Sequence, residues 1–391
     1  MPDMDKRLCH VLLVYRDMIP SIRLCGHGQM QWLAKMKHIE YRATPIARLK
    51  QAEIDWADVV LLGRLDNWFE LQVAYQLHHA GKYLIYVMDD DLLNVPQGLG
   101  VSAYYRNEKV KRRIRKMIDM SQAVLSTSAV ILEKYAKTGV KKAILTDGYL
   151  MGSGCKGVRQ GKGEIRIGFA GSADRLVDVE RILAASLFRI KEEYQERVQF
   201  EFFGVQPSFA KGIGARMIPY TDTYENYRHK LMERNWDIGL APMPDTEFHA
   251  CKYINKFIEY ASADIVGVFS RVKPYIRMED TPDIAVLCDN NEESWYQAIK
   301  ALIDNPERCY QIREKACKYI QERFVLDVVA VRLKEDMQDV FEFRAPKLRR
   351  RNPLFFLRTA GTLSRMADIL TVYGWETIPR AIRKIKRNMC K

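Results

Sequence analysis

Two lysines and a glutamate near residue 255 have the spacing of groups that could bind a phosphate and a sugar together. The segment that begins at Trp236 reads WDIGLAPMPDTEFHACKYINKFIEYASADIVGVFS and predicts a strand at 238–241, a proline break and an amphipathic helix. On that helix Lys252, Lys256 and Glu259 would stand at i, i+4 and i+7 and project from one face. Two cations could hold a diphosphate while the carboxylate accepts hydrogen bonds from hydroxyl groups. A nucleotide-sugar contains both a diphosphate and hydroxyl groups.

The same spacing is also typical of an ordinary solvent-exposed helix face with weak ion pairs. A second segment, Ile165–Glu180 (IRIGFAGSADRLVDVE), favours the binding interpretation. It predicts a strand, a turn at Gly171 and Ser172, and a helix. Such a strand–loop–helix opens nucleotide-binding domains, in which backbone N–H groups and the helix N-terminus meet phosphate.

Together the two segments resemble the donor-binding half of the GT-B glycosyltransferases, and most closely the group called glycosyl transferases group 1, or family 4. The resemblance rests on DIGLAP, an acidic and aromatic loop, K-x3-K-F-I-E-Y-A and the apolar strand V-x-V-F-S, in that order. It implies that Lys252 and Lys256 also serve catalysis. The donor-binding residues that it implies are Glu259 on the ribose, Lys252 and Lys256 on the diphosphate, and Gly171, Ser172 and Arg175 beside that diphosphate.

The chain departs from this group where the transferred sugar is held. Many relatives carry Glu-x7-Glu, whose first carboxylate contacts the sugar, and no such pair includes Glu259 here. Asp245 and Glu247 are the nearest acidic candidates for that contact. The usual Gly-x-Pro after the helix is replaced by Asp264-Ile265-Val266, so the resemblance does not identify the donor sugar.

A glycine-flanked histidine follows the first predicted strand, at 10–15. Gly26 and Gly28 would let the backbone approach a ligand, and His27 could act as an acid or base near neutral pH. An ordinary glycine loop with an exposed histidine has the same sequence. In the family this loop faces the donor phosphates and the acceptor. The resemblance therefore implies an acceptor or phosphate loop that includes Arg23, Gly26 and Gly28, with His27 as a catalytic group.

Three consecutive carboxylates, Asp89–Asp91, follow the predicted strand at 83–88. They could hold a divalent metal, as the Asp-x-Asp of GT-A glycosyltransferases does. A GT-A interpretation leaves the signature of the second half unexplained, and GT-B relatives carry a similar acidic run that faces the cleft. We therefore expect no metal and no cofactor, and we assign Asp90 to the acceptor side.

Short apolar strands alternate with helices along most of the chain and predict an α/β fold with parallel, doubly wound sheets. The Gly- and Lys-rich stretch 151–163 predicts a linker. It would separate an N-terminal Rossmann-like acceptor-side domain at 1–150 from a C-terminal nucleotide-sugar-binding domain at 164–330. Residues 331–391 are expected to form a crossing helix and a basic amphipathic tail. This is the GT-B architecture, in which two Rossmann-like domains face a cleft.

Most of the formal net charge of +13 lies in the tail. From Ala345 to Lys391, twelve Lys and Arg residues are opposed only by Asp368 and Glu376. The nearly neutral body gives no indication of a nucleic-acid groove. Apolar and aromatic residues between the basic clusters predict docking on an anionic membrane surface, although these helices could instead pack on the N-terminal domain.

The sequence has neither the apolar run of a transmembrane helix nor the form of a signal peptide, and its eight scattered cysteines predict reduced thiols in the cytoplasm. The basic tail would hold the protein on the inner face of the cell membrane, and the resemblance implies an enzyme. It would transfer a sugar from a nucleotide-sugar to a glycan or lipid-linked acceptor in surface polysaccharide or glycoconjugate synthesis. Two alternatives stay open: a GT-B-fold sugar-nucleotide epimerase, which lacks an acceptor, and a catalytically inactive GT-B scaffold.

Overall fold

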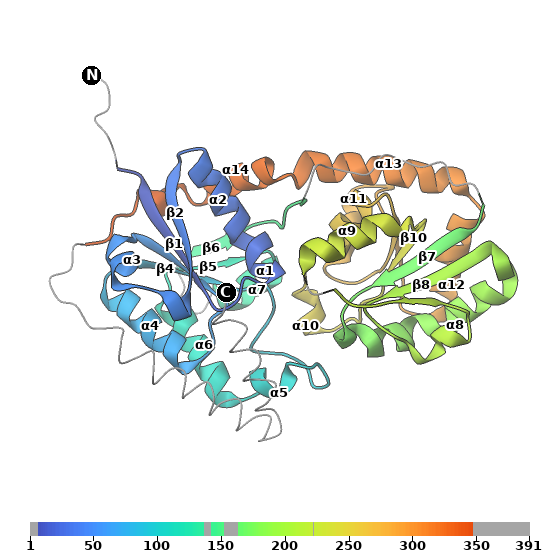
Figure 1. The fold of residues 1–391 in the computed structure, drawn as a ribbon, viewed down its shortest axis with the longest axis horizontal. Coiled ribbons are helices and arrows are strands. Elements are labelled where there is room, and N and C mark those ends of the chain that lie inside the picture. Colours follow the sequence, from blue (N-terminus) through green and yellow to red (C-terminus); the bar gives the residue numbers. More distant parts are fainter. Residues whose placement is uncertain (1–6, 137–141, 152–162, 222, 347–391) are drawn as a thin grey trace. The chain divides into compact units, whose positions relative to one another are not determined.

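Each half of the chain is built around a parallel six-stranded sheet in the computed structural model, which describes residues 7–136, 142–151, 163–221 and 223–346 (Figure 1). The chain divides into unit 1, Met1–Asp147 with Ala330–Lys391, and unit 2, Gly148–Val329. The predicted linker at 151–163 and the basic tail lie almost wholly outside the described residues. Two doubly wound parallel sheets confirm the predicted fold class.

Unit 1 has the strand order β2-β1-β3-β4-β5-β6, and all neighbouring strands are parallel. The strands are β1 Cys9–Tyr15, β2 Ile39–Pro45, β3 Val59–Gly63, β4 Tyr83–Val87, β5 Ala123–Ser126 and β6 Lys142–Leu145. The helices are α1 Pro20–Ile22, the π-helical turn η1 Arg23–His27, α2 Gly28–Lys35, η2 Ile46–Arg48, α3 Gln51–Trp56, α4 Trp68–His79, α5 Ser102–Tyr105, α6 Glu108–Met120 and α7 Ala129–Tyr135.

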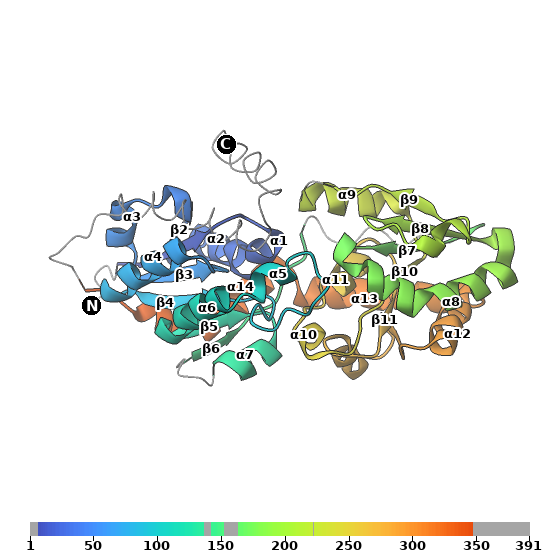
Figure 2. The same ribbon diagram turned by 90° about the horizontal axis from the view of Figure 1, so that it is seen from below.

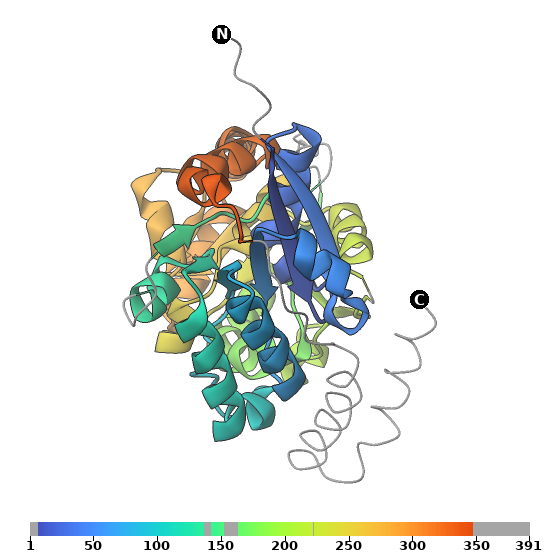
Figure 3. The ribbon, with the colours of Figure 1, turned by 90° about the vertical axis from the view of Figure 1, so that its left-hand side faces the viewer.

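The end of the described chain returns to unit 1 through α14 Leu326–Asp336 and α15 Gln338–Glu342. Ala330 and Leu333 of α14 are buried in the same apolar core as Val11 of β1 and Val59 of β3. Figure 3 shows these two helices in orange against the blue strands at the start of the chain. Unit 1 is therefore completed by residues that are more than 300 positions away from its first strand.

Unit 2 has the strand order β12-β11-β10-β7-β8-β9, again all parallel. The strands are β7 Ile165–Ala170, β8 Val198–Phe203, β9 Arg216–Ile218, β10 Ile238–Ala241, β11 Val266–Ser270 and β12 Val286–Cys288. The helices are η3 Ala173–Arg175, α8 Leu176–Tyr194, η4 Gln195–Arg197, η5 Ser208–Lys211, α9 Tyr224–Arg234, α10 Glu247–Ala250, α11 Asn255–Ser262, η6 Tyr275–Asp280, α12 Glu292–Ile303 and α13 Pro306–Arg323.

Two apolar cores cover the two faces of the unit 2 sheet. On one face α8 and α12 lie side by side and pack on strand residues such as Phe200 and Val268 (Figure 1, Figure 2). On the other face α11 and α13 enclose a cluster that contains Trp236 and Phe257. Because both faces are covered, the central strands β10 and β11 are apolar throughout instead of alternating, which explains why they can be recognised in the sequence.

Candidate functional site

The strand orders indicate where each unit would bind a ligand. In open α/β sheets, ligands bind beyond the carboxyl ends of the strands, at the point where the strand order reverses. In unit 2 that point lies between β7 and β10, and in unit 1 it lies between β1 and β3. We call these two places the switch points of the units.

The end of β7 carries the predicted phosphate loop. The Gly171 amide donates to the Phe203 carbonyl at 3.0 Å, so the expectation that this amide is available to phosphate is wrong. Gly171 is needed because it has no side chain: a Cβ there would lie 2.8 Å from the Phe169 ring. Ser172 is exposed and begins the turn η3, which leads into α8. Arg175 ends that turn, with its guanidinium 3.8 Å from Asp178.

The loop after β10 carries the other half of the switch point. Its backbone is anchored from two strands, since the Met243 amide donates to Ser270 Oγ at 2.8 Å and Asn290 Nδ2 donates to the Met243 carbonyl at 2.7 Å. Thr246 then caps α10 by accepting from the His249 amide. Asp245 and Glu247 are both exposed here, at the edge where the sugar contact was predicted.

The predicted single helix with Lys252 and Lys256 on one face is wrong. The chain forms the short α10, turns through residues 251–254 and begins again as α11 at Asn255, so Lys252 lies in the turn. The turn is held by Cys251 and Ile254, which are 0% and 1% exposed. Helical periodicity cannot reveal this break, because the burial of these two side chains decides it. Lys252 Nζ lies over the Phe248 ring, 4.7 Å from its centroid.

Lys256 and Glu259 do share a face, at i and i+3, and Glu259 is 4% exposed. Lys256 Nζ donates to Glu259 Oε2 at 2.6 Å. Tyr227 donates to the same oxygen at 2.8 Å, and Tyr224 donates to Oε1 at 3.0 Å. Lys256 also donates to the Tyr227 hydroxyl at 2.7 Å. The carboxylate is thus fixed in one orientation by three side chains.

This network sets both the charge of Glu259 and its remaining bonding capacity. Burial acts to raise the pKa of Glu259, but the charge of Lys256 and the hydrogen bonds from Lys256 and Tyr227 outweigh it, so the pKa lies below its usual value. A carboxylate offers about four lone-pair positions, of which these contacts use three. Glu259 can accept one more hydrogen bond, on Oε1, and Lys256 retains one N–H for an anion.

The two tyrosines were not predicted from the sequence. They lie more than 30 residues before Glu259 and reach it because Thr223 caps α9 beside α11. The one sequence signal is their spacing, since Tyr224 and Tyr227 are three positions apart and therefore share a face of α9.

The switch point of unit 2 is also crossed by an unpredicted contact. His249 Nε2 of α10 lies 3.8 Å from Asp178 Oδ2 of α8, and His249 Nδ1 lies 2.8 Å from Thr246 Oγ1. Burial raises the pKa of Asp178, against the opposing charges of Arg175 and Arg181. No sequence pattern joins these residues, because Asp178 and His249 are 71 positions apart and meet only where β7 and β10 lie next to each other.

The predicted glycine loop of unit 1 is wrong as a loop. Residues 20–35 form α1, the π-helical turn η1 and α2, with a kink at Gly26 (φ 174°, ψ −47°), and both Gly26 and Gly28 are buried. A Cβ on Gly26 would lie 3.5 Å from Leu125 and 3.7 Å from Leu61, which is ordinary van der Waals contact, so packing on the sheet does not require a glycine here. Arg23 begins the π-helical turn η1.

His27 faces the flank of β2. Its Nδ1 lies 2.9 Å from the Tyr41 hydroxyl, and Tyr41 pairs with Val11 in the middle of β1. The strand continues for four more residues to Pro45, which is about 13 Å of chain. Burial, with a smaller contribution from Arg23, lowers the pKa of His27. This position is a poor one for the predicted catalytic role, because ligands of such sheets bind at the strand ends.

The acidic run after β4 is bound by cations. Arg64 Nη1 donates to both oxygens of Asp89 at 3.1 and 3.0 Å and lies 3.7 Å from Asp90. Asp91 accepts from Lys134 at 3.1 Å and from the Tyr135 hydroxyl. Among the described residues no group of three His, Cys, Asp or Glu side chains is placed to hold a metal. Asp90, with a side chain 20% exposed, is the most accessible of the three.

The switch point of unit 1 is filled by a charge cluster that the sequence analysis missed. Arg16, directly after β1, donates to Glu70 at 2.7 and 2.5 Å and to Asp66 at 3.2 Å. The side chains of Asp66 and Glu70 are 0% and 1% exposed. Tyr104 also donates to Asp66, at 2.6 Å. Burial acts to raise the pKa of Asp66, but Arg16 outweighs it and leaves that pKa low.

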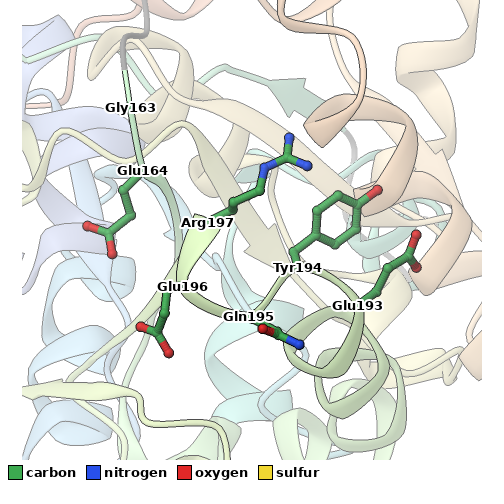
Figure 4. Close-up of a pocket in the computed structure, with 7 residues that line it drawn as sticks. All are labelled: Gly163, Glu164, Glu193, Tyr194, Gln195, Glu196 and Arg197. Carbon is green, nitrogen blue, oxygen red and sulfur yellow. The ribbon is translucent and has the colours of Figure 1, made fainter.

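A surface pocket of about 590 Å³ lies at the opposite edge of the unit 2 sheet (Figure 4). Its lining comes from Gly163 and Glu164 before β7 and from residues 193–197 before β8. The Arg197 guanidinium lies 5.3 Å from the Tyr194 ring centroid. Because it opens at the amino ends of the strands, this pocket is separate from the switch point.

Five of the described cysteines are free and buried, at positions 9, 25, 251, 288 and 309. Cys317 is disulfide-bonded, so the expectation of reduced thiols is wrong for this residue. Within the described part of the chain, no helix is both long and apolar enough to span a membrane.

No known family model matches the chain, and neither does any curated protein sequence. Solved structures do match over almost their whole length. Sucrose-phosphate synthase from Thermosynechococcus elongatus aligns with a TM-score of 0.56 at 11% identity, over 85% of this chain and 99% of that one. Anabaena HepE in complex with UDP-glucose aligns with a TM-score of 0.55 at 12% identity, over 85% of this chain and 100% of that one.

A putative UDP-N-acetylglucosamine 2-epimerase from Listeria monocytogenes also matches, with a TM-score of 0.51 at 12% identity, over 87% of this chain and 99% of that one. At these identities the likeness concerns the fold. It confirms the predicted GT-B fold of two Rossmann-like domains, while the family 4 subtype stays a prediction.

Proposed function

We propose that this protein is a glycosyltransferase that uses a nucleotide-sugar donor and binds it at the switch point of unit 2. The observation that carries the proposal is the buried Glu259, held ionised by Lys256 and two tyrosines next to that edge of a GT-B fold. The neighbour HepE was crystallised with UDP and with UDP-glucose, which supports a nucleotide-sugar as the ligand class.

The chemistry follows from the charges at this edge. Transfer breaks the bond between the anomeric carbon and the diphosphate and joins that carbon to an acceptor oxygen, while the acceptor hydroxyl loses its proton. Negative charge grows on the departing diphosphate, and preorganised cations stabilise it. Lys256 has one N–H left to donate to the departing diphosphate. Lys252, Arg175 and the N-terminus of α8 lie on the segments around Lys256 and would add positive charge there. Glu259 would accept a ribose hydroxyl.

The test is a panel of nucleoside diphosphates and their sugars, first for thermal stabilisation and then for turnover. We expect at least one nucleoside diphosphate to raise the melting temperature, and its sugar to be hydrolysed slowly or transferred to an added glycan or lipid-linked acceptor. If no member of the panel raises the melting temperature, the proposal is refuted. Binding without any turnover would favour the inactive scaffold.

A sugar-nucleotide epimerase is the second candidate, favoured by the structural likeness to the putative epimerase from Listeria monocytogenes. The two activities differ in their products, since epimerisation returns a nucleotide-sugar and transfer releases the nucleoside diphosphate. A coupled assay for released nucleoside diphosphate, with chromatography of the remaining nucleotide-sugar, separates them.

Metal independence is part of the proposal, because lysines and a helix terminus supply the positive charge. Activity should then survive EDTA. If it is lost and returns with Mn²⁺ or Mg²⁺, and if Asp90→Asn is also inactive, the acidic run after β4 binds a metal instead.

We further place the acceptor on unit 1, near Asp90, and the enzyme on the anionic inner face of the cell membrane, in surface polysaccharide or glycoconjugate synthesis. The membrane part rests on the basic tail, whose residues 347–391 lie outside the described part of the chain. Liposomes with phosphatidylglycerol should sediment the full chain but not a chain that ends at Phe343, and salt should reduce binding. Equal sedimentation of both would contradict this localisation.

A further inference from the structure

Tyr220 is one of the most exposed large hydrophobic residues in the described part of the chain, at 69%. It follows β9 by two positions and is preceded by an exposed proline. An aromatic ring left in water forgoes the stability that its burial would add. The residues that contact the Tyr220 ring therefore indicate what this exposed ring could bind.

The ring of Tyr220 lies against a glycine at the carboxyl end of β8. A Cβ on Gly204 would be 3.1 Å from the Tyr220 ring and 2.3 Å from the Gly171 carbonyl, and Gly204 has φ +84°. A side chain at this position would separate the ring from the sheet and strain the backbone. The absence of a side chain at Gly204 thus lets the Tyr220 ring lie close to the phosphate loop.

A short series of contacts joins Tyr220 to the carboxylate of the donor site. Tyr220 packs on Gly204, and Phe203, the residue before it, packs on Tyr227 with ring centroids 5.3 Å apart. Tyr227 donates to Glu259. One side of the ring is therefore supported by the β8 end, which Phe203 and Tyr227 connect to a carboxylate that can accept a ribose hydroxyl, while most of the ring surface stays exposed.

From this arrangement we infer that Tyr220 is the stacking surface for the base of the donor nucleotide. The inference rests on the proposed function and adds a residue and a ligand group to it: the planar heteroaromatic ring that is linked to the ribose. Stacking accepts any base, because every base has a π-face. Tyr220 would therefore raise the affinity for all nucleoside diphosphates without selecting among them.

The test compares Tyr220→Ala with Tyr220→Phe, which keeps the ring. Calorimetry measures the dissociation constants of UDP, GDP and ADP, and of inorganic pyrophosphate, which has no base. The matched control is Tyr310→Ala, which removes another exposed tyrosine of unit 2, on α13, with its side chain 38% exposed. Thermal unfolding of each variant checks that exposed positions were changed without loss of folding.

We expect Tyr220→Ala to weaken the tightest-bound nucleoside diphosphate roughly tenfold or more, and to leave pyrophosphate binding unchanged. Tyr220→Phe and Tyr310→Ala should bind as the unaltered protein does. Equal binding by Tyr220→Ala and the unaltered protein would overturn the inference while leaving the proposed function standing. An equal loss for pyrophosphate would also overturn it, because the effect would then be structural. If the unaltered protein binds no nucleoside diphosphate, the proposed function and this inference fall together.

Discussion

The switch point of unit 1 holds buried charges in direct contact, whereas the charged groups described at the switch point of unit 2 lie farther apart. Between β1 and β3, Arg16 is hydrogen-bonded to both Asp66 and Glu70, and the two carboxylates are buried. Between β7 and β10, His249 and Asp178 approach only to 3.8 Å. The same parallel topology thus carries a buried, hydrogen-bonded charge cluster in one unit and a longer ion pair in the other.

This difference between the units shows how a structural charge cluster can be distinguished from a ligand-binding site on the same fold. In unit 1 each buried charge has its partner in the protein, so little bonding capacity is left. In unit 2 Lys256 and Glu259 are fixed by neighbours but each retains capacity for one further bond. Orientation by the protein together with unused capacity is what a preorganised binding site requires.

The largest expected effect tests the buried charge cluster of unit 1. Arg16→Met should cost about 3–5 kcal/mol, because it leaves Asp66 and Glu70 buried without their cation. Hydrogen exchange of β1 and β3 measures the loss within unit 1. Arg175→Met is the matched change in unit 2, and because its partner Asp178 is 3.8 Å away and partly exposed, it should cost less than about 1 kcal/mol. Equal losses in the two units would contradict the comparison.

The next effect tests catalysis at the switch point of unit 2. Lys256→Ala should lower kcat about 100-fold, since the diphosphate gains charge in the transition state and one stabilising donor is removed. Steady-state kinetics with the donor identified by the panel gives the value. Lys318→Ala, a lysine with a side chain 77% exposed on α13, serves as the control. A change in KM alone would show that Lys256 binds ground state and transition state equally.

A smaller effect tests the ribose contact. Glu259→Gln keeps the shape of the side chain and loses the charge-assisted hydrogen bond, so the donor dissociation constant should rise about tenfold. Because Oε1 has one position left, 2′-deoxy and 3′-deoxy nucleoside diphosphates should differ: only one of them should bind more weakly than the parent to the unaltered protein. Equal losses for both would mean that the carboxylate accepts two hydroxyls.

The smallest effect compares the pH dependence of the two switch points. Asp66 has a lowered pKa in the folded protein, so its contribution to stability is complete above the unfolded value of 3.8 and is lost as pH falls through the folded pKa. Asp178 has a raised pKa, so its ionisation above that pKa disfavours folding. Asp66→Asn should therefore destabilise the protein at neutral pH.

Asp178→Asn should be slightly stabilising at neutral pH, and this difference should shrink as pH falls through the raised pKa of Asp178, whereas the Asp66→Asn difference should persist at pH 4. Urea unfolding at pH 7 and pH 4 measures both. A destabilising Asp178→Asn at pH 7 would show that the contact with His249 outweighs the cost of burying the carboxylate.

The sequence by itself determined the class of fold and part of the site. Runs of buried apolar residues predict parallel strands, and β10 has the predicted bounds, 238–241. The glycine turn after β7 is equally local, because the strand–loop–helix is contained in sixteen consecutive residues. The pairing of Lys256 with Glu259 could be predicted for the same reason, because residues three apart on one helix are neighbours whatever the rest of the chain does.

Only the tertiary structure decided the rest. The turn that removes Lys252 from the helix is set by the burial of Cys251 and Ile254. Arg16 meets Asp66, and His249 meets Asp178, because the order of strands in each sheet brings their ends together. Local periodicity extends over a few residues, whereas these contacts join residues 50 and 71 positions apart. The buried charge cluster of unit 1 and the longer ion pair of unit 2 are therefore properties of the folded sheets, because strand order alone brings these charged groups within bonding distance.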